Sequence, residues 1–484
     1  MQTTLTAVFV YLLIALAIGI LSCKRHMSSS DFIIGGRSLN FWLTALAAHA
    51  SDMSNWLFMG YPAMIFLGGV FNIWIAIGLI LCMFFNWRLI APKIRVLSEE
   101  TNTVTLSGLF ANSLDSSGGI RNFSSAFCCI FYTVYISAGL IGLGQLSETL
   151  LGVSYQSGIL FGTLIVVLYV IIGGFSTLAW LDFFQGTFLM GVILFVPLYL
   201  LPRLGGFEAI SLSLYEKGLA TSLFPSFHYL TYFKIISMTL GWGLGYFGQP
   251  HIITKFMGIK KTSEIRKSQR VGLSWMVLSL LGATLVGLVA TAFFRVPLND
   301  PEMIFISIVE LSFSPFISGF ILCAIIAAIV NVTSAQLLTL SSIISQDFYK
   351  KLCLGSSGKR EILITRLSIL IVAMIALFIA YLKPSSIYSL VLYAWSGLGA
   401  TFGPLLILLL YSKKVTKFGA WVGILSGGIL SAVWPFINTL FPIDIEPLLP
   451  AFSVSLLLNW LVSKMTLSRE NLFEFSENLK LFKD

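Results

Sequence analysis

The stretch LNFWLTALAAHASDMSNW, residues 39–56, decides how the rest of the chain is interpreted. With the apolar run that follows it, this stretch is long enough to cross a bilayer, which takes about 20 apolar residues. Near its middle it carries Asp52, flanked by Ser51, Ser54 and Asn55. A carboxylate at membrane depth is costly unless it faces a polar cavity or a cation. The pattern predicts a discontinuous helix whose freed carbonyls bind a cation and whose half-helix end faces a substrate. The alternative is a polar patch that only packs against other helices.

The composition indicates a polytopic membrane protein. Of the 484 residues, 57% are hydrophobic and 11% are charged, whereas a soluble chain has about 25% charged residues. The mean hydropathy of +0.91 agrees. The six cysteines form no CxxC pair, so we expect neither disulfides nor a metal site. Nucleotide-binding loops and hydrolase motifs are also missing, so the sequence predicts no enzyme. The N-terminus has no basic region before its apolar run, and we expect a retained first helix.

Apolar runs of spanning length predict about thirteen transmembrane helices, near 4–22, 39–70, 71–92, 121–150, 155–175, 181–201, 231–254, 270–294, 314–346, 364–382, 386–411, 416–436 and 447–463. An odd number places the two termini on opposite sides. With the N-terminus outside, the predicted inside loops hold all of the 30 Lys and Arg except Arg203, Lys217, Lys234, Arg295 and Lys383. The positive-inside rule therefore predicts the N-terminus outside and the C-terminus inside. This bias explains the net charge of +9 without nucleic acid or another acidic partner.

A second unusual span contains GWGLGYFGQPH, residues 241–251. Four glycines and a proline interrupt helical continuity there. Trp242, Tyr246 and Gln249 recur at helical spacing and are predicted to share one face. An aromatic wall with an amide suits a small amphipathic solute. The alternative is that the glycines permit close helix packing and the aromatic side chains lie at an interface.

Three further polar features lie at membrane depth. The span 314–346 carries a polar row in which Asn331 and Ser334 share a face; it is either a pathway or a set of hydrogen bonds between helices. Asp182 opens one predicted span and has no obvious basic partner nearby. It is either an N-cap or a stop on an ion's way to the cytoplasm. Tyr135 offers a hydroxyl to a cavity, or is a packed aromatic residue.

Four motifs resemble the sodium/solute symporter family, in particular its bacterial sodium/proline symporter branch: residues 35–39 (GGRSL), 50–54 (ASDMS), 172–175 (IGGF) and, above all, 241–251. The similarity runs from about residue 5 to 463. It implies an all-α fold with a ten-helix inverted-repeat core of five plus five helices, residues 39–411. The spans 39–70 and 231–254 would be the discontinuous first helices of the two repeats. An extra transmembrane helix and loop, 1–38, would precede the core, and two transmembrane helices with a short cytoplasmic tail, 412–484, would follow it.

The resemblance also implies a substrate site at mid-membrane. The substrate-side positions of the family match Ser54, Trp56, Tyr135, Trp242, Tyr246 and Pro250, and the helical spacing adds Gln249. Proline is therefore the expected substrate and sodium the expected coupling ion, with no organic cofactor. The resemblance further implies alternating access by a protein that functions as a monomer in the plasma (inner) membrane.

The ion site departs from the family pattern. The family binds sodium through carbonyls at the positions of Ala50, Met53 and Ala328 and through two consecutive hydroxyl residues, which are Asn331 and Val332 here. Sodium is a hard cation that prefers oxygen ligands, by the reasoning that applies to calcium. Asn331 retains an oxygen, whereas Val332 does not.

Other residues near this site leave several alternatives open for the coupling ion. Asp52 and Asp182, which match residues important for sodium coupling, are kept, while His49 stands where the branch usually has a small residue. Asn331 with Thr333 or Ser334 would preserve sodium coupling. Alternatively, sodium dependence is weak and protons couple through His49 or Asp52, because an unperturbed imidazole titrates near about pH 6.5. An uncoupled facilitator or sensor, and a symporter for another small amino acid or carboxylate, complete the alternatives.

Overall fold

The structure, a computed structural model, describes residues 2–22, 28–115, 118–296, 298–349, 358–412 and 414–481. Within these ranges the chain is helical and contains no strand. Several residues that carried predictions lie outside the described part: Cys23, Lys24, Arg25, Lys350, Lys351, Cys353 and Lys413. The cysteines for which the structure gives a state, Cys82, Cys128, Cys129 and Cys323, are free.

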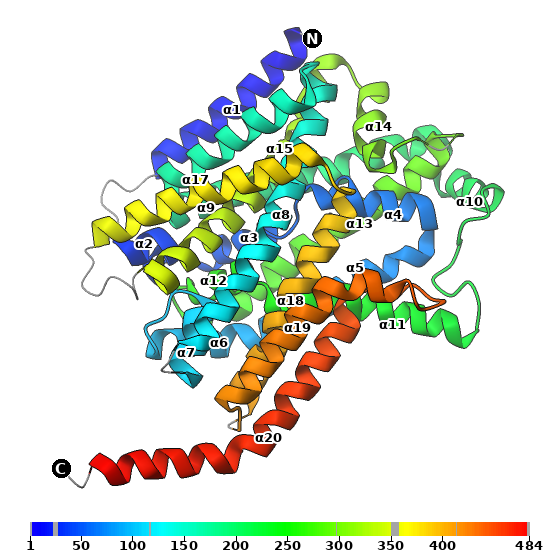
Figure 1. The fold of residues 1–484 in the computed structure, drawn as a ribbon. Helices are drawn as coiled ribbons and strands as arrows, with labels where there is room; N and C mark the ends of the chain where they lie inside the picture. The colour runs from blue at the N-terminus through cyan, green and yellow to red at the C-terminus, as the bar shows by residue number, and fades with distance from the viewer. Residues whose placement is uncertain are drawn as a thin grey trace.

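Nine long helices form most of the molecule (Figure 1): α1 (Gln2–Ser22), α8 (Gly119–Leu151), α9 (Tyr155–Leu200), α13 (Ile265–Phe293), α15 (Pro315–Ile343), α17 (Gly358–Leu382), α18 (Ile387–Tyr411), α19 (Lys417–Asn438) and α20 (Leu448–Leu481). The shorter elements are α2 (Ser29–Ile34), η1 (Gly35–Arg37), η3 (Val70–Asn72), α5 (Ile73–Phe85), the π-helical turn η4 (Asn86–Ile90), α6 (Ala91–Glu100), α7 (Leu106–Leu114), η5 (Pro202–Leu204), α10 (Gly206–Glu216), η7 (Thr262–Glu264), η8 (Pro301–Met303), α14 (Ile304–Ser312) and the π-helical turn η9 (Ile344–Tyr349).

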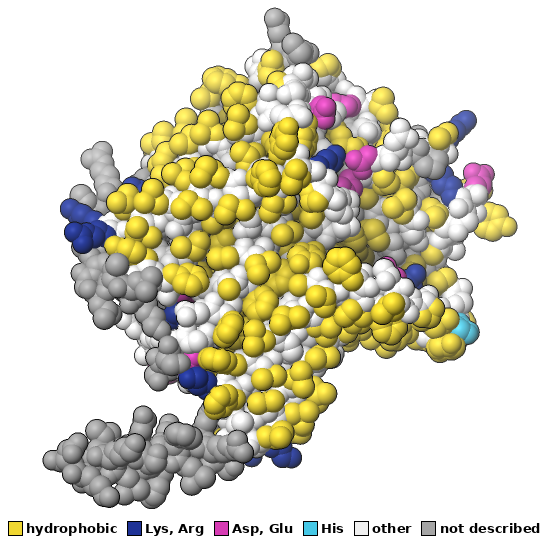
Figure 2. Space-filling model, in the orientation of Figure 1, with side chains coloured by type: hydrophobic (Ala, Val, Ile, Leu, Met, Phe, Trp, Pro, Cys, Tyr) yellow, Lys and Arg dark blue, Asp and Glu magenta, His cyan; other side chains and the backbone are white. Residues whose placement is uncertain are grey.

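Ten stretches of the described chain are long and apolar enough to cross a membrane. The surface agrees, because hydrophobic side chains cover most of the face in Figure 2, with Lys and Arg mainly at its margins. The multi-pass, all-helical class predicted from the composition is confirmed. The expected number of thirteen passes stays a prediction.

The first predicted discontinuous helix is interrupted as expected. Helix α3 (Phe41–Ala50) ends just before Asp52, and α4 (Gly60–Gly68) begins only after the short turn η2 (Asn55–Leu57). Two side chains cap the N-terminal ends of α3 and η2. The Asn40 side chain accepts the Leu43 N–H at 2.9 Å at the start of α3, and the Ser54 hydroxyl accepts the Trp56 N–H at 3.2 Å at the start of η2.

The second predicted discontinuous helix consists of α11 (Tyr229–Gly243), η6 (Leu244–Gly248) and α12 (Pro250–Met257). Pro250 starts α12, where its missing N–H costs no helical hydrogen bond. Glycine is required in η6 because α18 approaches closely. A Cβ at Gly248 would lie 2.6 Å from the Gly399 carbonyl oxygen, and one at Gly245 would overlap the Trp395 indole nitrogen.

Backbone hydrogen bonds join the two interrupted helices. The Leu39 N–H donates to the Gly258 carbonyl at 3.2 Å, and the Lys260 N–H donates to the Leu39 carbonyl at 2.8 Å. The start of the first interrupted helix therefore lies against the end of the second. This antiparallel arrangement brings the two breaks to a similar depth.

Helix α9 also contains a break. Its 46 residues would extend about 69 Å at 1.5 Å per residue, roughly twice the hydrocarbon thickness. Gly174 has non-helical dihedral angles (φ 60°, ψ −172°), which L side chains rarely adopt. The two predicted spans 155–175 and 181–201 therefore meet at Gly174 instead of in a loop.

Hydrogen bonds also join connecting segments that are far apart in the sequence. The Arg95 side chain donates to the Ile259 carbonyl at 2.7 Å. The Val70 N–H donates to the Ala220 carbonyl at 2.8 Å. The two sides predicted from the basic residues stay a prediction. Figure 1 shows the chain termini at opposite ends of the molecule.

Candidate functional site

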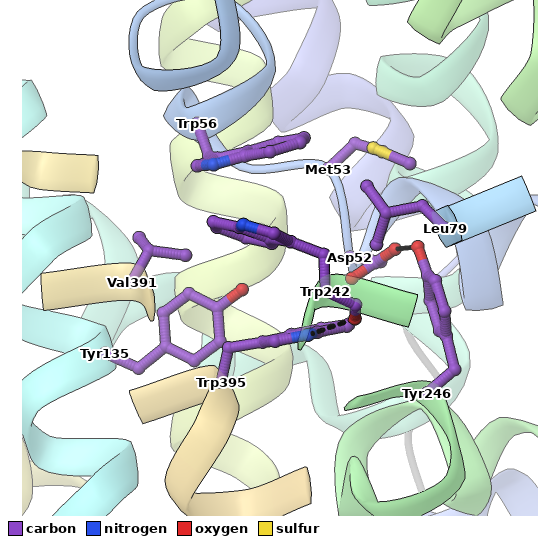
Figure 3. Close-up of a pocket in the computed structure, with 9 residues that line it drawn as sticks. All are labelled: Asp52, Met53, Trp56, Leu79, Tyr135, Trp242, Tyr246, Val391 and Trp395. Atoms are coloured by element: carbon purple, nitrogen blue, oxygen red, sulfur yellow. Dashed lines mark hydrogen bonds between the residues drawn. The ribbon is translucent and has the colours of Figure 1, made fainter. Parts of the chain in front are cut away.

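A small cavity lies between the two interrupted helices (Figure 3). It is lined by Asp52, Met53, Trp56, Leu79, Tyr135, Trp242, Tyr246, Val391 and Trp395. These side chains come from the break after α3, η2, α5, α8, α11, η6 and α18. The space left between these side chains is about 20 Å³, which is enough for about one water molecule. A solute therefore fits only when the aromatic side chains move apart.

Tryptophan rings form the walls of the cavity. The Trp56 and Trp242 rings are 4.9 Å apart with an interplanar angle of 34°. Trp395 donates its indole N–H to the Trp242 carbonyl at 2.8 Å and meets the Tyr246 ring edge-on at 5.1 Å. Trp395 thus fixes both residues of the second interrupted helix that face the cavity.

Sequence reasoning missed Trp395, Val391 and Leu79. A signal for Trp395 was present, because it precedes the run Ser396-Gly397-Leu398-Gly399-Ala400. Small residues along one helix permit another backbone to approach closely. That run did not identify its partner, however, and the partner proved to be η6.

Asp52 gives the cavity its only acidic group. The Tyr246 hydroxyl donates to its Oδ2 atom. In Figure 3 the Tyr135 hydroxyl and the other Asp52 oxygen point toward the space between the Trp242 and Trp395 rings. None of the nine lining residues is basic. A carboxylate beside aromatic faces is suited to a metal cation or an ammonium group.

The break after α3 frees two backbone carbonyls. In a continuous helix the Ser54 N–H would donate to the Ala50 carbonyl. Here it donates to the Asp52 carbonyl at 3.1 Å. Likewise, the Leu57 N–H donates to the Ser54 carbonyl at 3.0 Å instead of to the Met53 carbonyl. The carbonyls of Ala50 and Met53 therefore lose their helical partners. These are two of the oxygens that the family resemblance implies for sodium.

Helix α15 brings a polar group toward the same break, because it contacts both α3 and η2. Asn331 is buried, and neither its side-chain oxygen nor its nitrogen has a hydrogen-bond partner among the described residues. The Ser334 hydroxyl likewise has no hydrogen-bond partner among the described residues. Thr333 instead faces α8, since a Cβ at Gly139 would lie 2.5 Å from its hydroxyl oxygen. Buried polar atoms normally have partners, so Asn331 and Ser334 are available for a ligand.

Three predicted substrate-side residues lie outside the cavity lining. Ser54 caps η2, and Pro250 borders a different small cavity. Gln249 donates its amide N–H to the Trp395 carbonyl at 3.0 Å. The prediction that Gln249 shares a helical face with Trp242 and Tyr246 does not hold, because η6 ends at Gly248 and Gln249 is extended (φ −84°, ψ 106°).

His49 is packed away from the cavity. Its ring lies between Trp87 and Trp275, and its Nε2 atom accepts the Trp87 indole N–H at 3.0 Å. A Cβ at Gly272 would overlap the imidazole. The role of His49 in proton coupling stays a prediction.

Asp182 has a basic partner, so the expectation that none is nearby was wrong. The Lys255 ammonium lies 3.0 Å from the Asp182 carboxylate, and both side chains are about 97% buried or more. Sequence reasoning placed Lys255 in a cytoplasmic loop, but it lies in the last turn of α12. Asp182 itself lies two turns beyond the Gly174 break instead of opening a helix. The pair connects α9 to the second interrupted helix.

We expect Gly245→Ala to abolish transport and lower the thermal stability, because the added methyl group overlaps the Trp395 indole. Overpacking costs about 1–3 kcal/mol, and here it displaces a cavity wall as well. Thermal unfolding in detergent and solute uptake measure the two effects. Gly191→Ala is the matched control, since nothing lies within 4 Å of its added Cβ. Equal behaviour of the two variants would contradict the packing described for η6 and α18.

Interrupted helices around a small cavity in an all-helical, multi-pass fold define a membrane transporter of the class with discontinuous helices. Residues 32–427 match the sequence profile of the sodium:solute symporter family. The chain belongs to this family, as the resemblance of its motifs implied.

Characterised relatives cover nearly the whole chain. The high-affinity proline transporter PutP of Bacillus subtilis (strain 168) is 38% identical over 457 residues, which are 93% of this chain and 96% of that protein. The sodium/proline symporter of Staphylococcus aureus (strain NCTC 8325 / PS 47) is 37% identical over 480 residues, 96% of this chain and 93% of that one.

Solved structures support the fold. A Na⁺-coupled sialic acid symporter in a substrate-bound outward-open state superposes with a TM-score of 0.80 at 16% identity, covering 96% of this chain and 98% of that one. A nucleobase-cation-symport-1 family transporter in a closed conformation gives a TM-score of 0.55 at 12% identity, covering 92% and 96%. At these identities the likeness concerns the fold alone.

Proposed function

We propose that this protein is a secondary active importer of L-proline that is coupled to a cation gradient, with sodium as the ion. The family and the names of its relatives support this proposal. The observation that carries it is the cavity, which combines one carboxylate and three tryptophans next to two freed carbonyls. Transport of a solute through such a site requires no bond to be made or broken, and we propose no enzyme activity and no organic cofactor.

The cavity matches the chemistry of proline. Proline carries a secondary ammonium, a carboxylate and a compact apolar ring. The ammonium suits the Asp52 side of the cavity, and the ring suits the faces of Trp242 and Trp395. The Trp56 indole N–H has no partner among the described residues and is available to a substrate carboxylate. A carboxylate left without any donor would make binding unfavourable.

For sodium we propose the carbonyls of Ala50, Met53 and Ala328 and the side-chain oxygen of Asn331, with Ser334 replacing the hydroxyl that Val332 lacks. The two freed carbonyls and the two partnerless polar side chains support this set. Asp52 lies beside the freed carbonyls, so its charge favours a cation there. Asp182 acts later, on the path by which the ion leaves, after its pair with Lys255 opens.

The cycle that we propose is alternating access. Sodium stabilises the outward-facing form, the aromatic walls close on proline, and opening on the other side releases both. Each ligand shifts this equilibrium only by its differential affinity for the two forms. In line with the distribution of basic residues, the N-terminus lies outside and the C-terminus inside the plasma (inner) membrane, and a monomer is the functional unit.

The test is uptake of labelled proline into proteoliposomes under an inward sodium gradient or an inward proton gradient, imposed separately. We expect uptake with sodium alone. Uptake with protons alone would assign coupling to Asp52 or His49. Counterflow that needs neither ion would identify a facilitator. Absence of proline uptake under every condition would exclude proline, and competition by other small amino acids and carboxylates would identify the solute.

The substitution pair Asn331→Ser with Val332→Thr restores the hydroxyls of the family pattern. We expect it to change the sodium concentration for half-maximal uptake by less than about threefold, because Asn331 and Ser334 already supply oxygens. Sodium titration of proline uptake measures this. Asn331→Ala is the comparison, and we expect it to raise that concentration at least tenfold. A large gain in sodium affinity in the hydroxyl pair would show that the native site is impaired.

A further inference from the structure

The segment between α19 and α20, residues 439–447, is held in a fixed shape. The Asn438 side chain donates to Asp444 and accepts the Ile445 N–H at 3.1 Å. The Trp434 indole N–H donates to the Ile445 carbonyl at 2.9 Å. Both helices follow the predicted ten-helix core, so the core resemblance assigns this connection no task.

This connection extends over the second interrupted helix. The Glu446 N–H donates to the Ser237 hydroxyl of α11 at 2.9 Å. A Cβ at Gly241 would overlap the Glu446 Cβ, so only glycine there lets the two segments touch. Gly241 immediately precedes Trp242, which forms a wall of the cavity. Glu446 therefore lies directly against the helix that carries this wall.

The Glu446 carboxyl group reaches the polar edge of Trp242. It lies near the Trp242 indole N–H and the Tyr388 hydroxyl of α18. The Trp242 and Tyr388 rings are 5.4 Å apart. That indole N–H has no well-aligned hydrogen-bond partner among the described residues. Glu446 is thus an acceptor beside the polar edge of a ring whose apolar face lines the cavity.

We propose that Glu446 is a positioning residue for substrate binding, which the C-terminal helix pair brings to the second interrupted helix and which holds the Trp242 ring in place. The proposal rests on the transport function proposed above. It also gives α19 and α20 a role, since they carry the group that orders a wall of the substrate cavity. On the prediction from the basic residues, this contact lies on the external side.

The protonation of Glu446 makes the contact depend on pH. Burial raises the pKa of Glu446 to about 8, with Asp444 adding to the increase, while the Trp242 indole and Lys234 oppose it. The other polar group that faces it is the Tyr388 hydroxyl. Glu446 binds its proton more tightly when the connection is packed on α11 than when the connection is displaced. Low pH therefore favours the packed form. This preference is lost as the pH rises toward 8, and it does not change further above that value.

The experiment compares wild-type protein with Glu446→Ala, Glu446→Gln and Asp444→Asn in proteoliposomes. Proline uptake is driven by a sodium gradient from pH 6 to 9, with equal pH on both sides so that no proton gradient contributes. Asp444→Asn tests the same connection from its neighbouring carboxylate, because Asp444 adds to the increase in the pKa of Glu446. The KM for proline and the maximal rate are determined separately at each pH.

We expect the wild-type KM to rise at least threefold between pH 6 and 8 and then to level off. Glu446→Gln, which stays neutral, should keep the low KM over the whole range. Asp444→Asn, which removes a neighbouring negative charge, should show a smaller rise in KM that levels off at lower pH. Glu446→Ala should raise the KM about tenfold at pH 6 with a maximal rate within twofold of wild type. An unchanged KM in Glu446→Ala, or a wild-type pH profile in Glu446→Gln, would overturn the positioning role while proline uptake by wild type still stands. Wild-type protein that takes up no proline would overturn the proposed function and this inference together.

Discussion

Asp52→Asn is expected to reduce proline uptake at least a hundredfold while leaving the protein folded. Asp52 is the one acidic residue among the nine that line the cavity, and it lies beside the freed carbonyls of Ala50 and Met53. Removing one partner of a buried charge pair costs about 2–5 kcal/mol, and each 1.4 kcal/mol is about tenfold in affinity. The asparagine oxygen still accepts the Tyr246 hydroxyl, so the packing around the site is retained. The loss of proline uptake therefore measures the effect of removing the negative charge of Asp52.

Uptake at sodium and proline concentrations well below saturation, together with thermal unfolding in detergent, separates the effect of charge from an effect on folding. Glu208→Gln neutralises an exposed carboxylate in α10, and its uptake should stay near wild type. Tyr246→Phe tests the hydrogen bond alone and should cost less than Asp52→Asn. Uptake above a tenth of the wild-type rate in Asp52→Asn would contradict a direct role of this carboxylate in binding the cation or the substrate ammonium.

Lys255→Met is the second change with a large expected effect, and it acts first on stability. It leaves the Asp182 carboxylate buried without a counter-charge between α9 and α12. Breaking a buried ion pair on one side costs about 3–5 kcal/mol, whereas replacing both charges by neutral groups is often harmless. We therefore expect a strong loss of thermal stability and of transport in the single variant. Asp182→Asn alone should be similarly harmful, because it leaves a buried ammonium.

The double variant Asp182→Asn with Lys255→Met should return the unfolding temperature to near the wild-type value. A double-mutant cycle on the unfolding free energy then gives a coupling of the opposite sign to the single losses. A double variant as unstable as the sum of the single variants would show that the two residues act independently. Transport that returns with stability would assign the pair a structural role. Transport that stays lost would support Asp182 as a stage in ion release.

Local sequence was sufficient for the interrupted helices. Asp52 with its small polar neighbours, and the glycines and proline of residues 241–251, cannot form continuous apolar helices, and the structure interrupts both segments there. These effects act within one or two helical turns, so the printed sequence contains them. The same is true of the cavity residues Trp242 and Tyr246, whereas Trp56 was predicted only from the family resemblance. Together with the composition, these patterns were enough to identify the class of membrane protein.

Only the tertiary structure determined the contacts between segments that are far apart in the chain. Lys255 pairs with Asp182 across 73 positions, and Trp395 contacts the Trp242 carbonyl across 153. Glu446 reaches Ser237 from a connection 209 residues away. Nothing in the period or composition of a single helix specifies which face of which other helix it meets, because that choice depends on the packing of all helices at once. The sequence therefore determined the fold class, the two breaks and the residues beside them, whereas helix packing decided which charges pair and which aromatic rings close the cavity.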